Sequence, residues 1–146
     1  MDVRIWGVMD DRLIEVVVAS TADGDGLVIE GLPEERRRTT RDRVAAALIN
    51  SRLVKEVLGF RACLKPHVTG SPTSDLDLPL ALAILLRVGT FGGGLRSVLA
   101  TGRLGLDGTV FSRDFDRPTT LRDVVDHLCH TPLLESEHMF GAVEEA

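Results

Sequence analysis

The segment from Leu76 to Leu86 constrains the fold of this 146-residue chain more than any other. It is apolar except for Asp77, and Pro79 falls where the first turn of a helix tolerates proline. A helix that is apolar on every side must be covered on every side. The segment is also too short for a bilayer, which needs roughly 20 residues. We therefore predict a buried helix over 77–87 at the centre of a globular domain.

The length and composition agree with one soluble domain. A chain of 146 residues buries roughly two-thirds of its unfolded surface, and charged residues make up an ordinary 27%. Two cysteines, Cys63 and Cys129, are too few for a disulfide framework. The start of the chain has no basic and apolar leader. We expect a cytoplasmic protein without membrane contact.

Strand and turn signals fill the first 30 residues. Residues 3–8, 13–19 and 27–30 are rich in alternating or β-branched side chains. The Asp-Gly-Asp-Gly sequence at 23–26 favours a tight hairpin turn. These three strands are predicted to form an antiparallel meander.

The remaining elements alternate between helices and strands. A helix is expected from Pro33 to about Asn50, a strand over 60–64, and a strand pair over 97–101 and 104–111. A last helix begins at Thr119 or Thr120 and runs through His130. After residue 131 the chain is predicted to be an acidic tail, 132–146, which leaves residues 1–131 as the domain.

Arg41 has the most unusual position in the sequence, because it is a charged residue on an apolar helix face. Helical periodicity puts it on the apolar face of the helix at 33–50, near Val44 and Ala45. A buried guanidinium must be paired, and Asp75 and Asp77 are the nearest suitable acids. We predict that an Arg41 ion pair with Asp77 or Asp75 docks this helix onto the start of the buried one.

Five arginines cluster in the same helix, at positions 36, 37, 38, 41 and 43. Arg36 and Arg43 are predicted on the face opposite the apolar stripe, so Arg36, Arg37 and Arg43 are candidates for binding DNA phosphates. The net charge of −5 and the absence of interleaved aromatic residues weigh against a base-stacking surface. A salt-bridged helix surface is the alternative.

The sequence gives little support for a catalytic site. No glycine-rich loop is followed by the lysine and hydroxyl of a phosphate-binding loop, so no ATPase site is expected. Ser71 and Ser74 lie on a loop before a helix and leave a relict serine hydrolase open, but no lysine follows Lys65.

The histidines offer one further candidate site. His127, Cys129 and His130 lie on the last predicted helix, and His138 follows. A structural zinc site needs a second pair of ligands. We expect no metal and no cofactor.

Several segments resemble the N-terminal domain of magnesium-chelatase-like (ComM-type) proteins. They are Gly-Leu-Pro at 31–33, Thr-Arg-Asp-Arg-Val at 40–44, Ala-Leu-Ile-Asn-Ser at 47–51, Asp-Leu-Pro-Leu-Ala at 77–81 and Gly-Arg-Leu-Gly-Leu-Asp-Gly at 102–108. The resemblance implies an α+β fold like ribosomal protein S5 domain 2, shared with the protease domain of Lon and the C-terminal domain of RadA. It implies one mixed sheet, two main helices and a C-terminal helix.

The same resemblance bears on activity. In Lon a serine before the second helix and a later lysine form the catalytic dyad. Here Leu76 stands at the serine position and the lysine has no counterpart. We therefore expect no peptidase activity.

The family normally continues with several dozen further residues after the hairpin and then an AAA+ ATPase module. This chain is expected to be a shortened, stand-alone relative of that N-terminal domain. The expected role is non-catalytic assembly or interaction, as a homo-oligomer or on a larger AAA+ ATPase that serves DNA recombination or uptake. Direct DNA binding and a relict hydrolase remain the alternatives.

Overall fold

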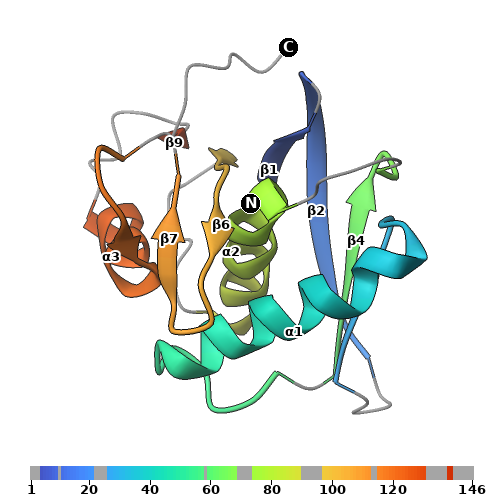
Figure 1. Ribbon diagram of the computed structural model, residues 1–146, viewed down its shortest axis with the longest axis horizontal. Coiled ribbons are helices and arrows are strands. Elements are labelled where there is room, and N and C mark those ends of the chain that lie inside the picture. The colour runs from blue at the N-terminus through green and yellow to red at the C-terminus, as the bar shows by residue number, and fades with distance from the viewer. Residues whose placement is uncertain are drawn as a thin grey trace.

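The computed structural model describes residues 4–9, 11–21, 26–57, 59–68, 74–89, 97–112, 115–130 and 138–139 (Figure 1). Its helices are α1 (Glu34–Asn50), η1 (Ser74–Leu76, a 3-10 turn), α2 (Asp77–Val88) and α3 (Leu121–His130). Its strands are β1 (Arg4–Met9), β2 (Arg12–Ser20), β3 (Leu27–Glu30), β4 (Phe60–Lys65), β5 (Ser97–Leu99), β6 (Arg103–Leu104), β7 (Thr109–Phe111), β8 (Thr119–Thr120) and β9 (His138–Met139).

The strands form two sheets. The main sheet has the order β3-β4-β2-β1-β5-β9, in which β2 is antiparallel to both of its neighbours and the other pairs are parallel. A smaller antiparallel sheet has the order β6-β7-β8. The predicted α+β class, mixed sheet and three helices are confirmed, and the small sheet is an addition to them.

The predicted meander is wrong in its third strand. β1 and β2 form an antiparallel pair, but β4 lies between β2 and β3 and pairs in parallel with β3. The connection from β3 through α1 to β4 is a crossover, which parallel neighbours require. The Asp-Gly-Asp-Gly sequence at 23–26 favours a local turn. It cannot indicate that β4, which begins more than 30 residues later in the chain, pairs with β3.

The expected pairing of 97–101 with 104–111 also differs. β5 joins the main sheet in parallel with β1, while β6 pairs with β7. Two residues of the predicted tail, His138–Met139, pair with β5. The remaining residues of 132–146 lie outside the described part, so the boundary at 131 stays a prediction.

α2 lies between the two sheets, which explains its sequence. It packs against β1, β2 and β4 on one side and β6 on the other, with α1 against it (Figure 1). Every residue from Asp77 to Leu85 is buried. The helix ends at Gly89, whose positive φ lets its N–H reach the carbonyls of Leu85 and Leu86. Among the described residues, no helix has the length and apolarity that a membrane span requires.

The two faces of the main sheet differ. One face carries the core, to which α1, α2 and α3 all contribute buried apolar side chains, and it includes Ile5, Ile14, Val16, Ala62 and Leu64. The opposite face of β3, β4, β2 and β1 has no helix from the described residues packed on it. We call it the open face; its members are Arg4, Trp6, Val8, Leu13, Glu15, Val17, Ala19, Val28, Glu30, Arg61, Cys63 and Lys65.

Gly31 ends β3 in a conformation that a side chain does not tolerate. Its φ is +100°, and a Cβ atom would lie 2.9 Å from the carbonyl oxygen of Leu64. Gly89 has a similar φ of +94° but open space around it. We expect Gly31→Ala to cost about 1–3 kcal/mol more than Gly89→Ala in the free energy of unfolding, because only the former adds a steric clash. Chemical denaturation of both variants measures this, and equal losses would contradict it.

Candidate functional site

A buried ion pair joins α1, α2 and β6. The Arg43 Nε and Nη2 atoms donate to the two carboxylate oxygens of Asp77 at 2.6 and 2.8 Å, and the Leu104 N–H donates to Asp77 at 3.0 Å. The Asp77 side chain is 0% exposed and that of Arg43 is 22% exposed. We call this arrangement the Asp77 junction. Its bidentate geometry fixes both the position and the rotation of α1 on α2.

The electrostatics of the Asp77 junction reflect burial and pairing together. The hydrogen bond to Asp77 raises the pKa of Arg43. Burial raises the pKa of Asp77, while the hydrogen bonds from Arg43 and from the Leu104 N–H oppose that rise. Short contacts from the guanidinium to both carboxylate oxygens fit an ionised pair, in which the arginine compensates the desolvated carboxylate.

The predicted ion pair of Arg41 with Asp77 or Asp75 is wrong, because Asp77 pairs with Arg43 instead. Arg41 is 41% exposed and pairs with its neighbour Asp42 at 3.0 Å, and Asp75 is exposed. The buried residues of α1 are Thr40, Val44, Ala47 and Leu48. On a helical wheel, positions 41 and 43 flank this stripe at roughly 80° on opposite sides. Periodicity favours Arg41 when Ala45 is counted in the apolar face, whereas the buried stripe is centred midway between positions 41 and 43; α2 lies on the side of Arg43.

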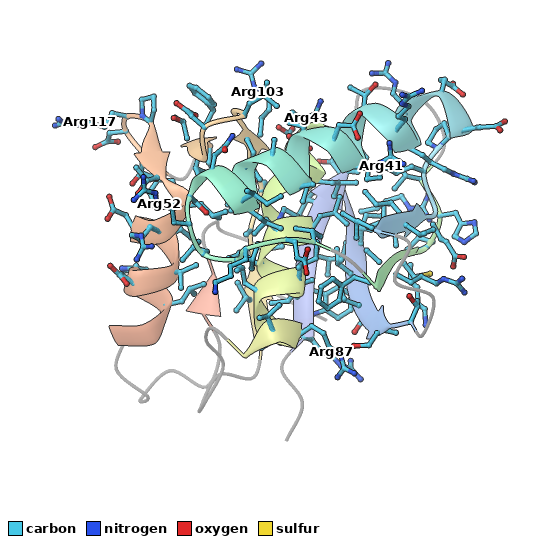
Figure 2. All side chains as sticks on the ribbon, turned by 90° about the horizontal axis from the view of Figure 1, so that it is seen from below. Arg41, Arg43, Arg52, Arg87, Arg103 and Arg117 are labelled. Atoms are coloured by element: carbon cyan, nitrogen blue, oxygen red, sulfur yellow. The ribbon has the colours of Figure 1, made fainter. Side chains whose placement is uncertain are left out.

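The three arginines proposed for DNA binding have separate surroundings. The prediction that Arg43 lies free on the opposite helix face is wrong, because its guanidinium is hydrogen-bonded to Asp77. The Arg37 Nε donates to the Leu32 carbonyl at 3.0 Å, and Arg36 is exposed. From the small sheet, Arg103 lies over the Phe111 ring, 5.0 Å from its centroid. Figure 2 shows Arg43 and Arg103 on one side of the molecule and Arg87 on the opposite side.

A buried core residue, Leu76, stands at the position that matches the Lon serine. Leu76 is 0% exposed, and a Cβ atom on Gly7 would lie 2.7 Å from its side chain. Of the two candidate serines, Ser71 lies outside the described residues. Ser74 begins η1, and its side chain also lies outside the described part.

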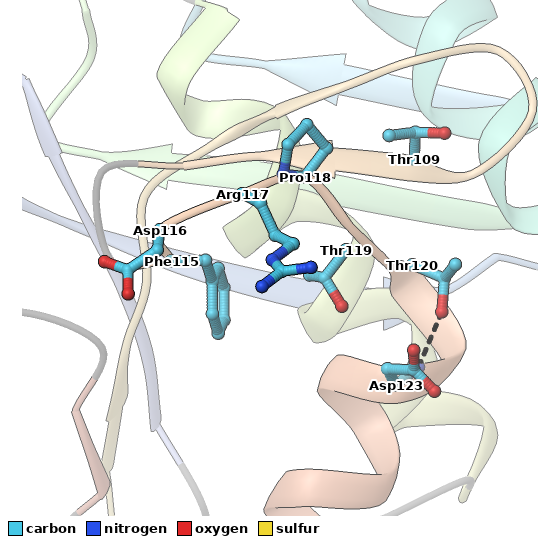
Figure 3. A pocket seen from close by; sticks show the side chains of 8 residues that line it. All are labelled: Thr109, Phe115, Asp116, Arg117, Pro118, Thr119, Thr120 and Asp123. Atoms are coloured by element: carbon cyan, nitrogen blue, oxygen red, sulfur yellow. Dashed lines mark hydrogen bonds between the residues drawn. The ribbon is translucent and has the colours of Figure 1, made fainter.

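A surface pocket of about 730 Å³ opens beside the small sheet (Figure 3). Arg117 extends between Phe115 and Thr119, and the Asp123 N–H donates to Thr120 Oγ1 at 3.0 Å, which caps α3. Two acids and one arginine give this pocket mixed charge. A smaller hollow of about 310 Å³ lies by the start of α1, with Arg37 and His67 in its lining.

The histidines considered as metal ligands are only partly described. His127 lies on α3, whereas the side chains of Cys129, His130 and His138 fall outside the described part. Within the described residues, no group of three or more potential ligands could hold a metal ion.

Comparison with known families adds to this geometry. The family model described as subunit ChlI of Mg-chelatase matches residues 14–119. The chain belongs to this family. The matched region runs from β2 to β8 and contains every residue of the Asp77 junction, so the resemblance to magnesium-chelatase-like proteins is confirmed. No curated protein matches the chain.

Sequence reasoning missed two partners of Asp77 in this ChlI-family domain. Arg43 stands in the Thr-Arg-Asp-Arg-Val segment that carried part of the resemblance, two positions from the arginine that was chosen. The Leu104 N–H is a backbone donor, which no residue type reveals. The sequence signal that could have identified Arg43 is its position in α1, two residues from Arg41 and as close to the buried stripe.

Proposed function

We propose that this ChlI-family domain is a non-catalytic assembly module. In this proposal it works in the cytoplasm, without cofactor, by contact with further copies of itself or with a larger ComM-type AAA+ ATPase. The process served is DNA recombination or uptake, as the resemblance implies. No peptidase or ATPase chemistry is assigned to the domain.

The observation that carries the proposal is the start of α2. In Lon-like enzymes this position presents a nucleophile, whereas here Leu76 is packed in the core against Gly7. The polar group beside it, Asp77, uses both carboxylate oxygens in the Asp77 junction. A carboxylate that is paired with arginine and 0% exposed positions helices, and a substrate cannot reach it for general-base catalysis.

Assembly is favoured over direct DNA binding by how the arginines are used. Two of the three candidates donate to groups of the domain itself, Arg43 to Asp77 and Arg37 to Leu32. Arg36 and Arg37 are exposed, but the Arg37 Nε is held by the Leu32 carbonyl, and two phosphate contacts at most give weak binding. DNA binding with a steep loss of affinity in salt would overturn this preference.

Light scattering on a sizing column, over a series of protein concentrations, tests the proposal. We expect a discrete oligomer that dissociates toward the 15.9-kDa chain on dilution. A strict monomer throughout would contradict self-assembly. Labelling with a serine-reactive fluorophosphonate tests the hydrolase alternative, and we expect no labelling.

A further inference from the structure

The open face of the main sheet combines exposed apolar side chains with an unpaired buried donor. Val17 and Val28 are 39% and 40% exposed, and Cys63 is half-buried between their strands. Trp6 is the only tryptophan of the chain. Its indole Nε1 is buried and has no hydrogen-bond partner among the described residues. Because that atom is already buried in the single chain, the surface that this face offers to a partner consists of its exposed apolar and charged side chains.

The strand register arranges this face in rows. One row runs from Trp6 on β1 to Glu15 on β2 and Lys65 on β4. The next runs from Val17 on β2 to Cys63 on β4 and Glu30 on β3. The first row therefore carries an acid on β2 and a base on β4, with the Arg4 Nε 3.8 Å from Glu15, while the second row is apolar over β2 and β4.

These rows are complementary to themselves under a two-fold rotation. An axis parallel to the strands, between β2 and β4, would place β2 of one copy over β4 of the other. Glu15 then faces Lys65 of the second copy, and Val17 faces Cys63. Sheets pack face to face about 10 Å apart with nearly aligned strands, as this rotation requires. Each contact occurs twice, as in any interface of this symmetry.

We propose that two copies of this chain associate through their open faces, with Glu15 of each copy paired to Lys65 of the other. The inference rests on the proposed assembly function and names its contact surface. Burial of Val17 and Val28, which are 39% and 40% exposed in the single chain, supplies the apolar contribution. Because the face is small and mixed in character, the association is expected to depend on concentration.

Charge reversal and mixing test this pairing. In Glu15→Lys, two cations face each other across the interface; in Lys65→Glu, two anions do. We expect each variant alone to be monomeric by light scattering at concentrations where the parent chain is a dimer. An equimolar mixture restores opposite charges at both contacts, so we expect it to dimerise with a dissociation constant at least tenfold lower than that of either variant alone.

Mixing separates the interface from effects within one chain, because Glu15 and Lys65 also lie opposite each other on neighbouring strands. Strain within one copy is not relieved by a second copy. Circular dichroism establishes that both variants fold. Glu56→Lys, a charge reversal at an exposed residue outside the open face, is the control and should leave the dimer intact.

Trp6 supplies a direct readout from the open face. We expect its emission to shift to longer wavelength as the parent chain is diluted, and not to shift for Glu15→Lys alone. Dimerisation without any effect of either reversal, or reversals that mixing does not rescue, would overturn the open-face contact and leave the assembly function standing. A parent chain that is monomeric throughout would overturn both the open-face dimer and self-assembly, and would leave contact with a larger ATPase as the remaining form of the proposed function.

Discussion

Arg43→Met is expected to lower the free energy of unfolding by about 3–5 kcal/mol, because it leaves the Asp77 carboxylate buried without its countercharge. Asp77 is 0% exposed, so water cannot replace the guanidinium without opening the contact between α1 and α2. Urea denaturation at neutral pH measures the loss. Arg41→Met is the matched control: it makes the same substitution two residues away, at an exposed pair with Asp42, and should change stability by less than about 0.5 kcal/mol. Equal losses would show that the Asp77 junction contributes nothing specific.

The pH dependence of the same variant gives a second signature. Burial already raises the pKa of Asp77, and removing Arg43 takes away a group that lowers it. A carboxyl with a folded pKa above its unfolded value favours folding when protonated, and this stability is lost as pH rises through the folded pKa. The deficit of Arg43→Met should therefore shrink as pH falls toward the usual range of aspartate, while Arg41→Met should show no such trend.

Leu76→Ser restores a serine at the Lon nucleophile position, and we expect it to destabilise the fold without creating an enzyme. Removing a fully buried leucine and burying a hydroxyl should cost roughly 3–5 kcal/mol. The chain has no lysine after Lys65 to activate the hydroxyl. Thermal unfolding measures the loss, and fluorophosphonate labelling tests for a reactive serine.

The control for this substitution is Leu106→Ser. Leu106 is 61% exposed between β6 and β7, so the same change there should have little effect on stability. Fluorophosphonate labelling of Leu76→Ser, or its full stability, would contradict the view that the start of α2 is structural core.

The local elements were predictable because each depends on neighbouring residues. The all-apolar run with Pro79 near its start predicted α2, and the predicted strand at 27–30 coincides with β3. The sheet order was not predictable in the same way. Whether β3 pairs with β2 or β4 depends on the crossover through α1, and the Asp-Gly-Asp-Gly sequence at 23–26 predicts a hairpin in either case.

In the candidate site, too, the local features were predictable from the sequence and the tertiary pairing was not. The sequence predicted an ion pair between an arginine of α1 and Asp77 or Asp75, because a guanidinium on an apolar helix face has to be paired. Its choice of Arg41 was wrong: Arg43 makes the pair, and the two arginines flank the buried stripe symmetrically. The choice between them is made by where α2 and β6 lie, which is tertiary information.

The insertion of β4 between β2 and β3 has a consequence for synthesis. A ribosome releases the chain from its N-terminus, so β3 emerges before the strand that it pairs with. Until residues 60–65 follow, the β1–β2 hairpin is the part of the described main sheet that can close. The apolar side chains of β3 therefore remain without their partner strand while the whole of α1 is synthesised. This interval is when a nascent chain of this topology most needs protection from its neighbours.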